Sequence, residues 1–248
     1  MLINNLFSVK NKNILISGAT SGIGFEIAEA LNANGANVLG IGRSPRLANA
    51  NFNYLQCDIN DHAGFDKLLK DYFDPNHNKL NVYFHIAGIT LPSVTSQQSF
   101  DDFESTIRTN LLSAYNCASL SAELMKENSS GSIILVTSIG ALLAFPNNPG
   151  YMASKGGLRQ VGMSLANDYG QYGVRVNNLV PGYIKTNMTA KSYEDVTSHN
   201  ARANKTMLNR WGDPSDLIGA SIFLASNASN YITGHDLFVD GGWNSKGL

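Results

Sequence analysis

Residues 13–24 read NILISGATSGIG, a short strand-like run followed directly by a turn that contains three glycines. After this turn, apolar residues recur at helical spacing until Asn34 and Gly35 end the pattern. Strand, glycine turn and helix in this order are typical of a phosphate-binding loop, because bare glycines let the backbone approach a pyrophosphate. The N-terminus of the helix adds free N–H groups and a partial positive charge. The sequence therefore predicts an α/β fold that binds a dinucleotide.

The alternation of strand and helix continues along the chain. Helical patterns separate further strand-like runs at residues 37–42, 53–57, 80–84, 131–138, 174–180 and 237–240. No repeat, linker or low-complexity block interrupts this order. Such alternation predicts a parallel, doubly wound sheet of the Rossmann type with helices on both faces. We expect a single domain over residues 1–248.

Size and composition exclude several classes of protein. A chain of 248 residues can bury one α/β domain but leaves no room for a separate substrate domain. Its 43% hydrophobic and 15% charged residues suit a compact protein, and its net charge of −1 does not favour nucleic acid or an anionic membrane as partners. Cys57 and Cys117 are too few for a disulfide framework or a metal knuckle. Residues 1–7 lack the features of a signal peptide, so we expect a cytoplasmic protein.

Tyr151 and Lys155 form the first candidate catalytic pair. Side chains four residues apart share one face of a helix, with their Cβ atoms about 5–6 Å apart. A nearby cation stabilises a phenolate and lowers the tyrosine pKa from its usual value of about 10. Tyr151 is therefore a candidate general acid and base near neutral pH, although such pairs also occur by chance.

Ser138 ends the strand predicted at residues 131–138, and the carboxyl ends of such strands are where open α/β sheets bind ligands. Ser138 followed thirteen residues later by Tyr151-x-x-x-Lys155 resembles the active site of the short-chain dehydrogenase/reductase family. The glycine spacing in residues 18–24 also matches the version found in this family. The resemblance extends over essentially the whole chain. It implies an oxidoreductase that moves hydride between a nicotinamide cofactor and a carbonyl/alcohol pair.

The resemblance also assigns catalytic roles. Ser138 would orient the substrate oxygen, and Tyr151 would transfer the proton. Lys155 would lower the tyrosine pKa and hold the nicotinamide ribose. Asn110, within a long helix predicted from Ser99 to about residue 128, would position a water that relays protons to the lysine. No metal is expected, because Tyr151 and Ser138 polarise the substrate.

The resemblance further implies which residues surround the dinucleotide. Asp58 would lie beside the adenine ring, although an aspartate there could also serve as a helix N-cap. His85-Ile86-Ala87-Gly88 departs from the Asn-Asn-Ala-Gly usual in the family, and we expect His85 to be a hydrogen-bonded structural residue. Residues 181–186 would hold the nicotinamide carboxamide. The expected set is Gly18, Thr20, Ser21, Gly22, Ile23, Gly24, Arg43, Ser44, Asp58, Ile59, Ala87, Gly88, Tyr151, Lys155, Pro181, Gly182, Ile184 and Thr186.

The end of the second strand favours NADP(H) over NAD(H). Dehydrogenases that prefer NAD carry an acidic residue at this position, where it binds the ribose hydroxyls and repels a 2′-phosphate. This chain has Gly42 there, followed by Arg43 with Arg46 close by. A guanidinium can bind a phosphate through paired, charge-assisted hydrogen bonds. Strongly NADP-selective relatives often carry a second basic residue where this chain has Ser21, so use of NAD(H) stays possible.

Residues 187–209 are polar and weakly periodic, which suits a mobile lid over the substrate. Few large apolar residues occur there, which favours a sugar, polyol or sugar acid, and the final motifs resemble gluconate 5-dehydrogenase-like members. The same charges could instead solvate a surface loop. The polar residues concerned are Lys191, His199, Arg202, Asn204 and Lys205.

Two other functions would also fit parts of this sequence. An acyl-carrier-protein ketoreductase would look similar, but residues 127–130 and 167–172 lack the basic residues that dock an acidic carrier. A dinucleotide-binding regulator would typically have lost the Tyr or the Lys of the active site. We also expect a homotetramer, with apolar contacts supplied by Leu111, Leu112, Leu165 and residues 243–248.

Overall fold

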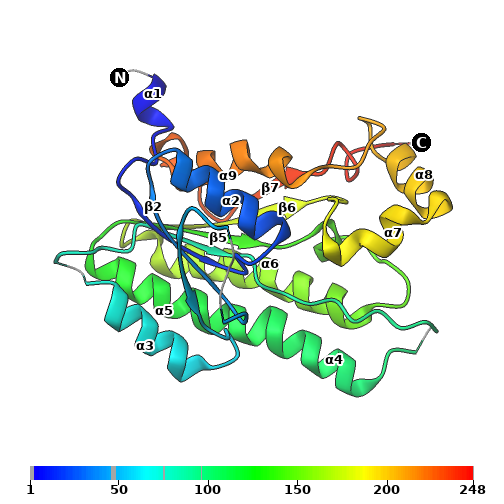
Figure 1. Cartoon of the computed structure of the whole chain (residues 1–248), viewed down its shortest axis with the longest axis horizontal. Helices are drawn as coiled ribbons and strands as arrows, with labels where there is room; N and C mark the ends of the chain where they lie inside the picture. Colours follow the sequence, from blue (N-terminus) through cyan, green and yellow to red (C-terminus); the bar gives the residue numbers. More distant parts are fainter. Residues whose placement is uncertain (1–2, 46–48, 75, 96, 248) are drawn as a thin grey trace.

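The computed structural model describes residues 3–45, 49–74, 76–95 and 97–247. Within them, seven parallel strands form one sheet with the order β3-β2-β1-β4-β5-β6-β7 (Figure 1). The predicted fold class is confirmed, and each predicted strand is present within two residues of its expected ends. The strands are β1 (Asn13–Ser17), β2 (Asn37–Gly42), β3 (Asn53–Gln56), β4 (Val82–His85), β5 (Gly131–Val136), β6 (Val174–Pro181) and β7 (Asp236–Val239).

Helices cover both faces of this sheet. One layer holds α2 (Gly22–Ala33) and α9 (Ile218–Ala225), and the other holds α3 (His62–Tyr72), α5 (Ser113–Glu127) and α6 (Pro149–Gly170) (Figure 1). The remaining helical elements are short. They are α1 (Ile3–Leu6), α4 (Phe100–Ile107), the π-helical turn η1 (Arg108–Leu112), α7 (Ala190–Glu194), α8 (Val196–Lys205) and the 3₁₀ turns η2 (Ile139–Ala141), η3 (Asn187–Thr189), η4 (Pro214–Leu217) and η5 (Asn227–Ser229).

Strand β1 shows why the sheet is apolar on both sides. Successive side chains of a strand point to opposite faces. Ile14 and Ile16 pack with the α2 and α9 layer, whereas Leu15 packs with the α3, α5 and α6 layer. All three are fully buried. A strand covered on both faces needs a continuous apolar run, which is the pattern found in residues 14–16.

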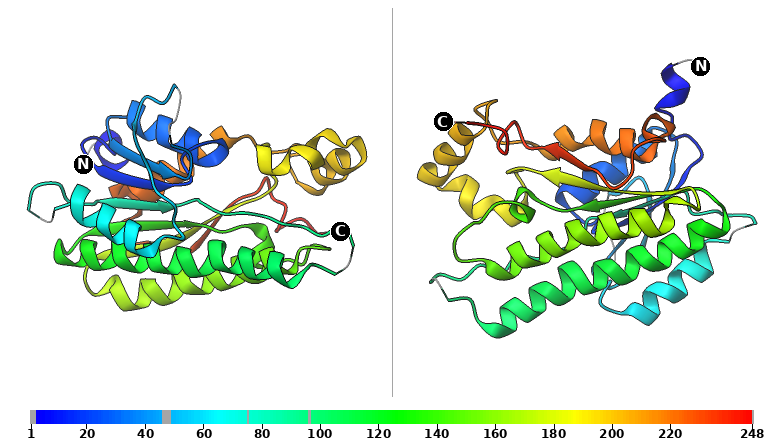
Figure 2. Two further views of the ribbon diagram at one scale, coloured as in Figure 1. Left: turned by 60° about the horizontal axis from the view of Figure 1, so that its bottom comes forward. Right: turned by 180° about the vertical axis from the view of Figure 1, so that it is seen from behind.

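The strand order creates a crevice at the carboxyl end of the sheet. After β3 the chain returns to the other side of β1 and adds β4, which pairs with β1 so that His85 lies beside Ser17. Ligands of open α/β sheets bind where the strand order reverses in this way. Helices α7 and α8 extend beyond the body of the molecule as a small separate lobe, which Figure 2 shows most clearly.

The helix predicted from Ser99 is confirmed, with one irregularity. The Ser99 hydroxyl accepts a hydrogen bond from the Asp102 N–H at 3.1 Å, as a capping residue does. The helical run then continues through α4, η1 and α5 as far as Glu127. The π-helical turn η1 contains Asn110, and such turns are frequent at functional sites. In the part of the chain that the structure describes, no helix is long and apolar enough to cross a membrane.

Candidate active site

The turn between β1 and α2 is packed too tightly for any side chain at Gly24. A Cβ atom there would lie 2.1 Å from the Gly18 carbonyl oxygen, so the loop can keep this path only with glycine. Ser21 is the N-cap of α2, but its side chain makes no capping hydrogen bond, and the first turn carries no acidic residue. The free N–H groups of this turn and the helix dipole therefore suit a pyrophosphate.

A cleft of about 290 Å³ opens beside this turn. A second cavity of about 120 Å³ adjoins it and shares Ile23, Ile86, Gly88, Thr186 and Met188 with the first. Of the residues expected around the cofactor, all except Ser44 line one or both cavities. The carbonyl of Ser44 instead accepts a hydrogen bond from the Tyr54 hydroxyl at 2.8 Å. The sequence did not predict the further lining residues Gly42, Cys57, Asn60, Ile86, Ile89, Thr109, Val136, Thr137, Asn187, Met188 and Thr189.

Gly42 and Arg43 lie at the far end of the larger cleft. A Cβ atom at Gly42 would lie 2.6 Å from Cγ2 of Thr20, which leaves no room for an acidic side chain. Arg43 is exposed, and within the described residues no carboxylate lies at ion-pair distance from its guanidinium. The cleft thus has a positive charge, the Arg43 guanidinium, just after β2, and the last residue of β2 carries no negative charge. Arg46 lies outside the described residues.

Asp58 lines the same cleft but does not cap a helix. Its Oδ1 accepts hydrogen bonds from the Asn60 backbone N–H at 2.9 Å and from the Asn60 side-chain amide at 3.1 Å. The residue that caps α3 is Asp61, whose Oδ1 accepts from the Gly64 N–H at 3.0 Å. The prediction of Asp58 as an N-cap was therefore wrong, because the helix begins three residues later than the strand end suggested.

Ser138, Tyr151 and Lys155 all line the smaller cavity. Ser138 follows β5 and accepts a hydrogen bond from the Gly140 N–H at 3.0 Å. Tyr151 and Lys155 come from the first two turns of α6, as the spacing predicted. Lys155 is only 4% exposed, and its Nζ donates to the Val136 carbonyl oxygen at 2.8 Å. The three side chains expected to do chemistry are thus brought together in one place.

The electrostatics of the pair differ from the prediction. Burial raises the pKa of Tyr151 above its ordinary value, the Ser138 hydroxyl opposes this rise, and Tyr183 adds to it. Lys155 does not lower the tyrosine pKa here, because its Nζ lies 5.8 Å from the centroid of the tyrosine ring and bonds to a carbonyl instead. Burial also lowers the pKa of Lys155, to about 8, so the ammonium form still prevails at pH 7.

Asn110 joins three segments that surround the cavity. Its side-chain oxygen accepts from the Ile89 N–H at 2.8 Å, and its amide donates to the Ile89 carbonyl at 2.8 Å and to the Ser154 hydroxyl at 3.2 Å. It is fully buried and does not line either cavity. The side chain of Asn110 therefore fixes the segment after β4 against helix α6.

His85 is the buried structural residue that the sequence predicted. Its Nδ1 hydrogen-bonds with the Tyr83 hydroxyl at 2.8 Å and contacts the Ser17 hydroxyl at 3.4 Å, while its Nε2 has no partner among the described residues. Burial, and then the charge of Lys155, lower the pKa of His85 to about 3. The imidazole is consequently neutral at physiological pH, and His85 lines neither cavity.

A cluster of aromatic residues that the sequence did not predict lies next to the segment that lines the smaller cavity. The ring of Tyr183 lies 4.9 Å from Trp243, 5.2 Å from Trp211 and 5.9 Å from Phe145, between ring centroids. Tyr183 follows Pro181 and Gly182, which line the cavity directly. We call Phe145, Tyr183, Trp211 and Trp243 the aromatic wall. The sequence did not predict the aromatic wall because its four residues lie far apart along the chain.

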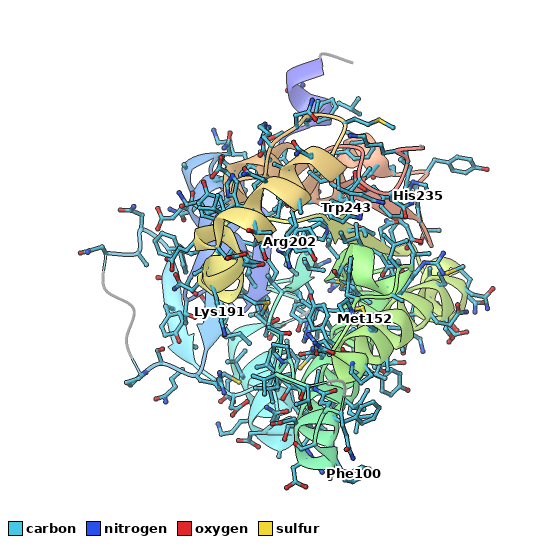
Figure 3. All side chains as sticks on the ribbon, turned by 90° about the vertical axis from the view of Figure 1, so that its right-hand side faces the viewer. Phe100, Met152, Lys191, Arg202, His235 and Trp243 are labelled. Atoms are coloured by element: carbon cyan, nitrogen blue, oxygen red, sulfur yellow. The ribbon has the colours of Figure 1, made fainter. Side chains whose placement is uncertain are left out.

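The polar stretch predicted as a lid forms the helices α7 and α8, which its weak periodicity did not reveal. Of its five named polar residues, Lys191, Asn204 and Lys205 are exposed. His199 stacks on Trp211 with ring centroids 5.7 Å apart. Arg202 alone places its guanidinium over the aromatic wall, 4.8 Å from the centroid of the Tyr183 ring. In Figure 3 helices α7 and α8 face α6, where Met152 is labelled.

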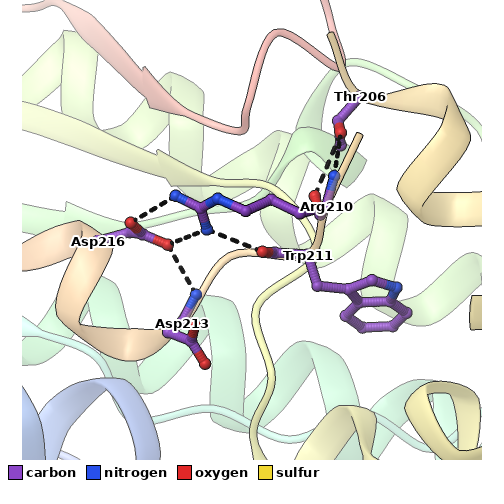
Figure 4. A network of polar contacts seen from close by, with 5 residues as sticks. All are labelled: Thr206, Arg210, Trp211, Asp213 and Asp216. Atoms are coloured by element: carbon purple, nitrogen blue, oxygen red, sulfur yellow. Dashed lines mark hydrogen bonds and ion pairs between the residues drawn. The ribbon is translucent and has the colours of Figure 1, made fainter. Parts of the chain in front are cut away.

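A polar network fixes residues 206–216, which connect α8 to η4 (Figure 4). The Arg210 guanidinium donates to both carboxylate oxygens of Asp216, at 2.7 and 2.9 Å, and to the Trp211 carbonyl at 2.9 Å. Hydrogen bonding to Arg210 lowers the pKa of Asp216 to about 2. The Asp213 N–H donates to the same carboxylate at 2.8 Å, and Thr206 pairs with the Arg210 backbone. Trp211 is thereby held in position beneath the lid.

Comparison with known proteins agrees with this geometry. Residues 18–244 match the family model described as Enoyl-(Acyl carrier protein) reductase. The chain is 34% identical over 251 residues to 2-dehydro-3-deoxy-D-gluconate 5-dehydrogenase from Pseudoalteromonas atlantica, covering 96% of this chain and 97% of the relative. It is 33% identical over 245 residues to 3-oxoacyl-(acyl-carrier-protein) reductase from Chlamydia pneumoniae, covering 93% and 96%.

A solved structure gives the same result for the fold. Gluconate 5-dehydrogenase from Burkholderia cenocepacia, crystallised with NADP and tartrate, superposes with a TM-score of 0.92 at 28% identity, covering 98% of this chain and 99% of that one. The family model spans most of the chain, and the relatives align along nearly its full length. The chain is an oxidoreductase and belongs to the short-chain dehydrogenase/reductase family.

Proposed function

We propose that this protein is an NADP(H)-dependent enzyme that interconverts a carbonyl and an alcohol on a small polar substrate such as a sugar, polyol or sugar acid. The observation that carries the proposal is that Ser138, Tyr151 and Lys155 line one cavity, which is continuous with the cleft beside the glycine turn. The cofactor and the reacting groups would then meet where the two cavities join. We further propose that the whole chain acts as one domain with residues 187–209 as its substrate lid.

Different residues around the cavity would transfer the proton and orient the substrate oxygen. When bound, the reduced cofactor supplies a hydride to the carbonyl carbon. Tyr151 donates its phenolic proton to the substrate oxygen in reduction and takes a proton back in oxidation. Its raised pKa keeps the phenol protonated, which is the form that reduction needs. Ser138 donates a hydrogen bond that orients the same oxygen, and its hydroxyl opposes the rise in the pKa of Tyr151.

Two further residues complete this arrangement. Lys155 would also hold the nicotinamide ribose, beside residues 181–186, which would hold the carboxamide. Asn110 holds the backbone of Ile89 through two hydrogen bonds and touches Ser154 on α6. We propose that the π-helical turn at Asn110 positions a water that returns protons to Lys155.

The preference for NADP(H) is supported by the end of β2. A negatively charged side chain at Gly42 would collide with Thr20, so the cleft lacks the group that repels a 2′-phosphate. Arg43 lines the cleft and has no carboxylate partner within the described residues. A charge-assisted hydrogen bond contributes about 1.5–3 kcal/mol, which corresponds to a preference of roughly ten- to a hundredfold.

A small polar substrate is supported by the size of the inner cavity, about 120 Å³, and by the names of the relatives. A 3-oxoacyl-(acyl-carrier-protein) substrate is the second candidate, because one relative carries that name. Against it, residues 127–130 and 167–172 contain no Arg or Lys that could bind an acidic carrier. The experiment is turnover of sugars, polyols, sugar acids and β-ketoacyl thioesters with each cofactor. Activity confined to thioesters or to long apolar ketones would contradict the proposal.

We also propose a homotetramer in which only part of the apolar contacts expected from the sequence takes part. Leu165 and Trp243 are 5% and 9% exposed within one chain, so they cannot supply an interface. On the outer face of α5 and α6, Tyr115 and Met163 are 52% and 36% exposed, and Leu112 of η1 is 50% exposed. Burial of this apolar face against a second copy would stabilise the assembly. Light scattering that finds a monomer at micromolar concentration would contradict the proposal.

A further inference from the structure

Arg202 is a cation on the lid whose charge is not matched by any group in the described part of the chain. It lies on α8 and is half-buried, and its guanidinium carbon is 4.8 Å from the centroid of the Tyr183 ring. Its Nε is buried and has no hydrogen-bond partner among the described residues. No carboxylate in those residues lies at ion-pair distance from it. Buried donors are nearly always hydrogen-bonded, so an unpaired one indicates a partner that is not part of the protein.

The nearest acidic candidate on the same lid is already engaged. Asp195 is the N-cap of α8, where its Oδ2 accepts from the Ser198 N–H at 2.8 Å. That hydrogen bonding is the main reason why the pKa of Asp195 is lowered, and Arg202 is only the smallest contribution. Asp195 is also fully exposed, whereas the Nε of Arg202 is buried. Asp195 therefore does not neutralise Arg202.

The position of Arg202 relates it to the reacting groups. Neither Arg202 nor Tyr183 lines the smaller cavity, but Tyr183 follows Gly182, which does, and it is close enough to Tyr151 to raise the pKa of that phenol. The other polar side chains of the lid do not share this position. Lys191, Asn204 and Lys205 face solvent, and His199 is stacked on Trp211.

We propose that Arg202 binds the carboxylate of the substrate, so that the enzyme prefers ionised hydroxy and keto acids over neutral sugars and polyols. The planar guanidinium matches a carboxylate through two parallel hydrogen bonds. Stacking on the Tyr183 ring would hold the paired N–H donors of the Arg202 guanidinium in one orientation. This inference rests on the proposed function, because it names the class of substrate for the same cavity.

The test compares two probes that differ only at one terminus. D-Gluconate carries a carboxylate, and D-glucitol carries a hydroxymethyl group in its place. With NADP⁺, R202Q should lower kcat/KM for D-gluconate about 10- to 100-fold, because a charge-assisted hydrogen bond is lost. Its kcat/KM for D-glucitol should stay within about twofold of wild type. R202K should recover part of the loss, since lysine keeps the charge without the fork.

K205Q is the matched control, because Lys205 lies on the same helix and faces solvent. It should leave both probes unchanged, and R202Q should keep the wild-type melting temperature and NADP⁺ affinity. An equal loss on both probes, or no loss on either, would overturn the proposal. If neither sugar probe is turned over, calorimetric titration of tartrate into the enzyme with NADP⁺ decides on Arg202, and the wider substrate panel decides on the proposed function. Tartrate binding that R202Q abolishes and K205Q retains supports the carboxylate site, whereas binding unaffected by R202Q, or absent in wild type, contradicts it.

Discussion

The two ends of the cleft differ in structure, because one is formed mainly by backbone and the other mainly by side chains. At the cofactor end, backbone approaches backbone, and Gly24 lies so close to Gly18 that even one methyl group would collide. At the substrate end, side chains such as Tyr183, Trp211 and Arg202 meet from segments far apart in the sequence. A backbone cradle binds the parts of a cofactor that never vary, whereas a wall of side chains can change with the substrate. Substitutions at the two ends should therefore fail in different ways.

The largest effect is expected at the cofactor end. G24A would place a methyl group 2.1 Å from the Gly18 carbonyl, so the turn must move and its N–H groups lose their alignment. NADPH binding, measured by fluorescence titration, should disappear at concentrations that saturate wild type. The control is G219A, because a Cβ atom at Gly219 would meet no other atom. Wild-type affinity in G24A would show that the turn does not hold the pyrophosphate.

The next effect is a dependence of the free energy of unfolding on pH, caused by the buried residue His85 at the end of β4. His85 has a folded pKa of about 3 and an ordinary value of 6.5, so the unfolded chain binds a proton between these values and the folded chain does not. Stability should therefore fall as the pH drops through this window, by about 1.4 kcal/mol per pH unit. Wild type should lose about 2 kcal/mol more than H85N between pH 7 and pH 5 in urea unfolding. Parallel pH profiles for the two proteins would contradict the stated burial of His85.

A smaller effect is expected at the end of β2, where we propose that a side chain, Arg43, binds the 2′-phosphate of the cofactor. R43A should lower kcat/KM with NADPH by roughly ten- to a hundredfold and leave kcat/KM with NADH nearly unchanged. Wild type should show the matching preference for NADPH. Equal values with both cofactors in wild type, or no change in R43A, would show that Arg43 does not bind the 2′-phosphate.

The same contrast explains what the sequence could predict. The cofactor end is formed by local patterns, so residues 13–24 and the family resemblance carried by Ser138, Tyr151 and Lys155 were enough to predict the fold and many of the residues that line the two cavities. The aromatic wall was missed because Phe145, which is 38 residues before Tyr183, and the two tryptophans meet only through tertiary packing. No spacing rule applies to such contacts.

Two of the wrong predictions share one cause, which is that burial cannot be read from spacing, and the third concerns where a helix begins. Tyr151 and Lys155 do lie on one face of α6, but the phenol is buried and its pKa rises rather than falls. Leu165 and Trp243 are apolar, as contacts between subunits require, but both side chains are buried in hydrophobic clusters within a single chain. Asp58 and Asp61 are equally good capping residues in sequence, and only the position of the first turn of α3 separates them.

The central claim is that cofactor binding and proton transfer are separate properties of the two ends, joined at Tyr151. The most direct measurement takes wild type and Y151F through NADPH titration and carbonyl turnover in the same preparations. We expect nearly equal affinity for NADPH and a fall in kcat of at least about 10²–10⁴-fold, the contribution of a positioned proton donor. Retention of more than about a tenth of wild-type turnover, or loss of NADPH binding together with activity, would contradict the claim.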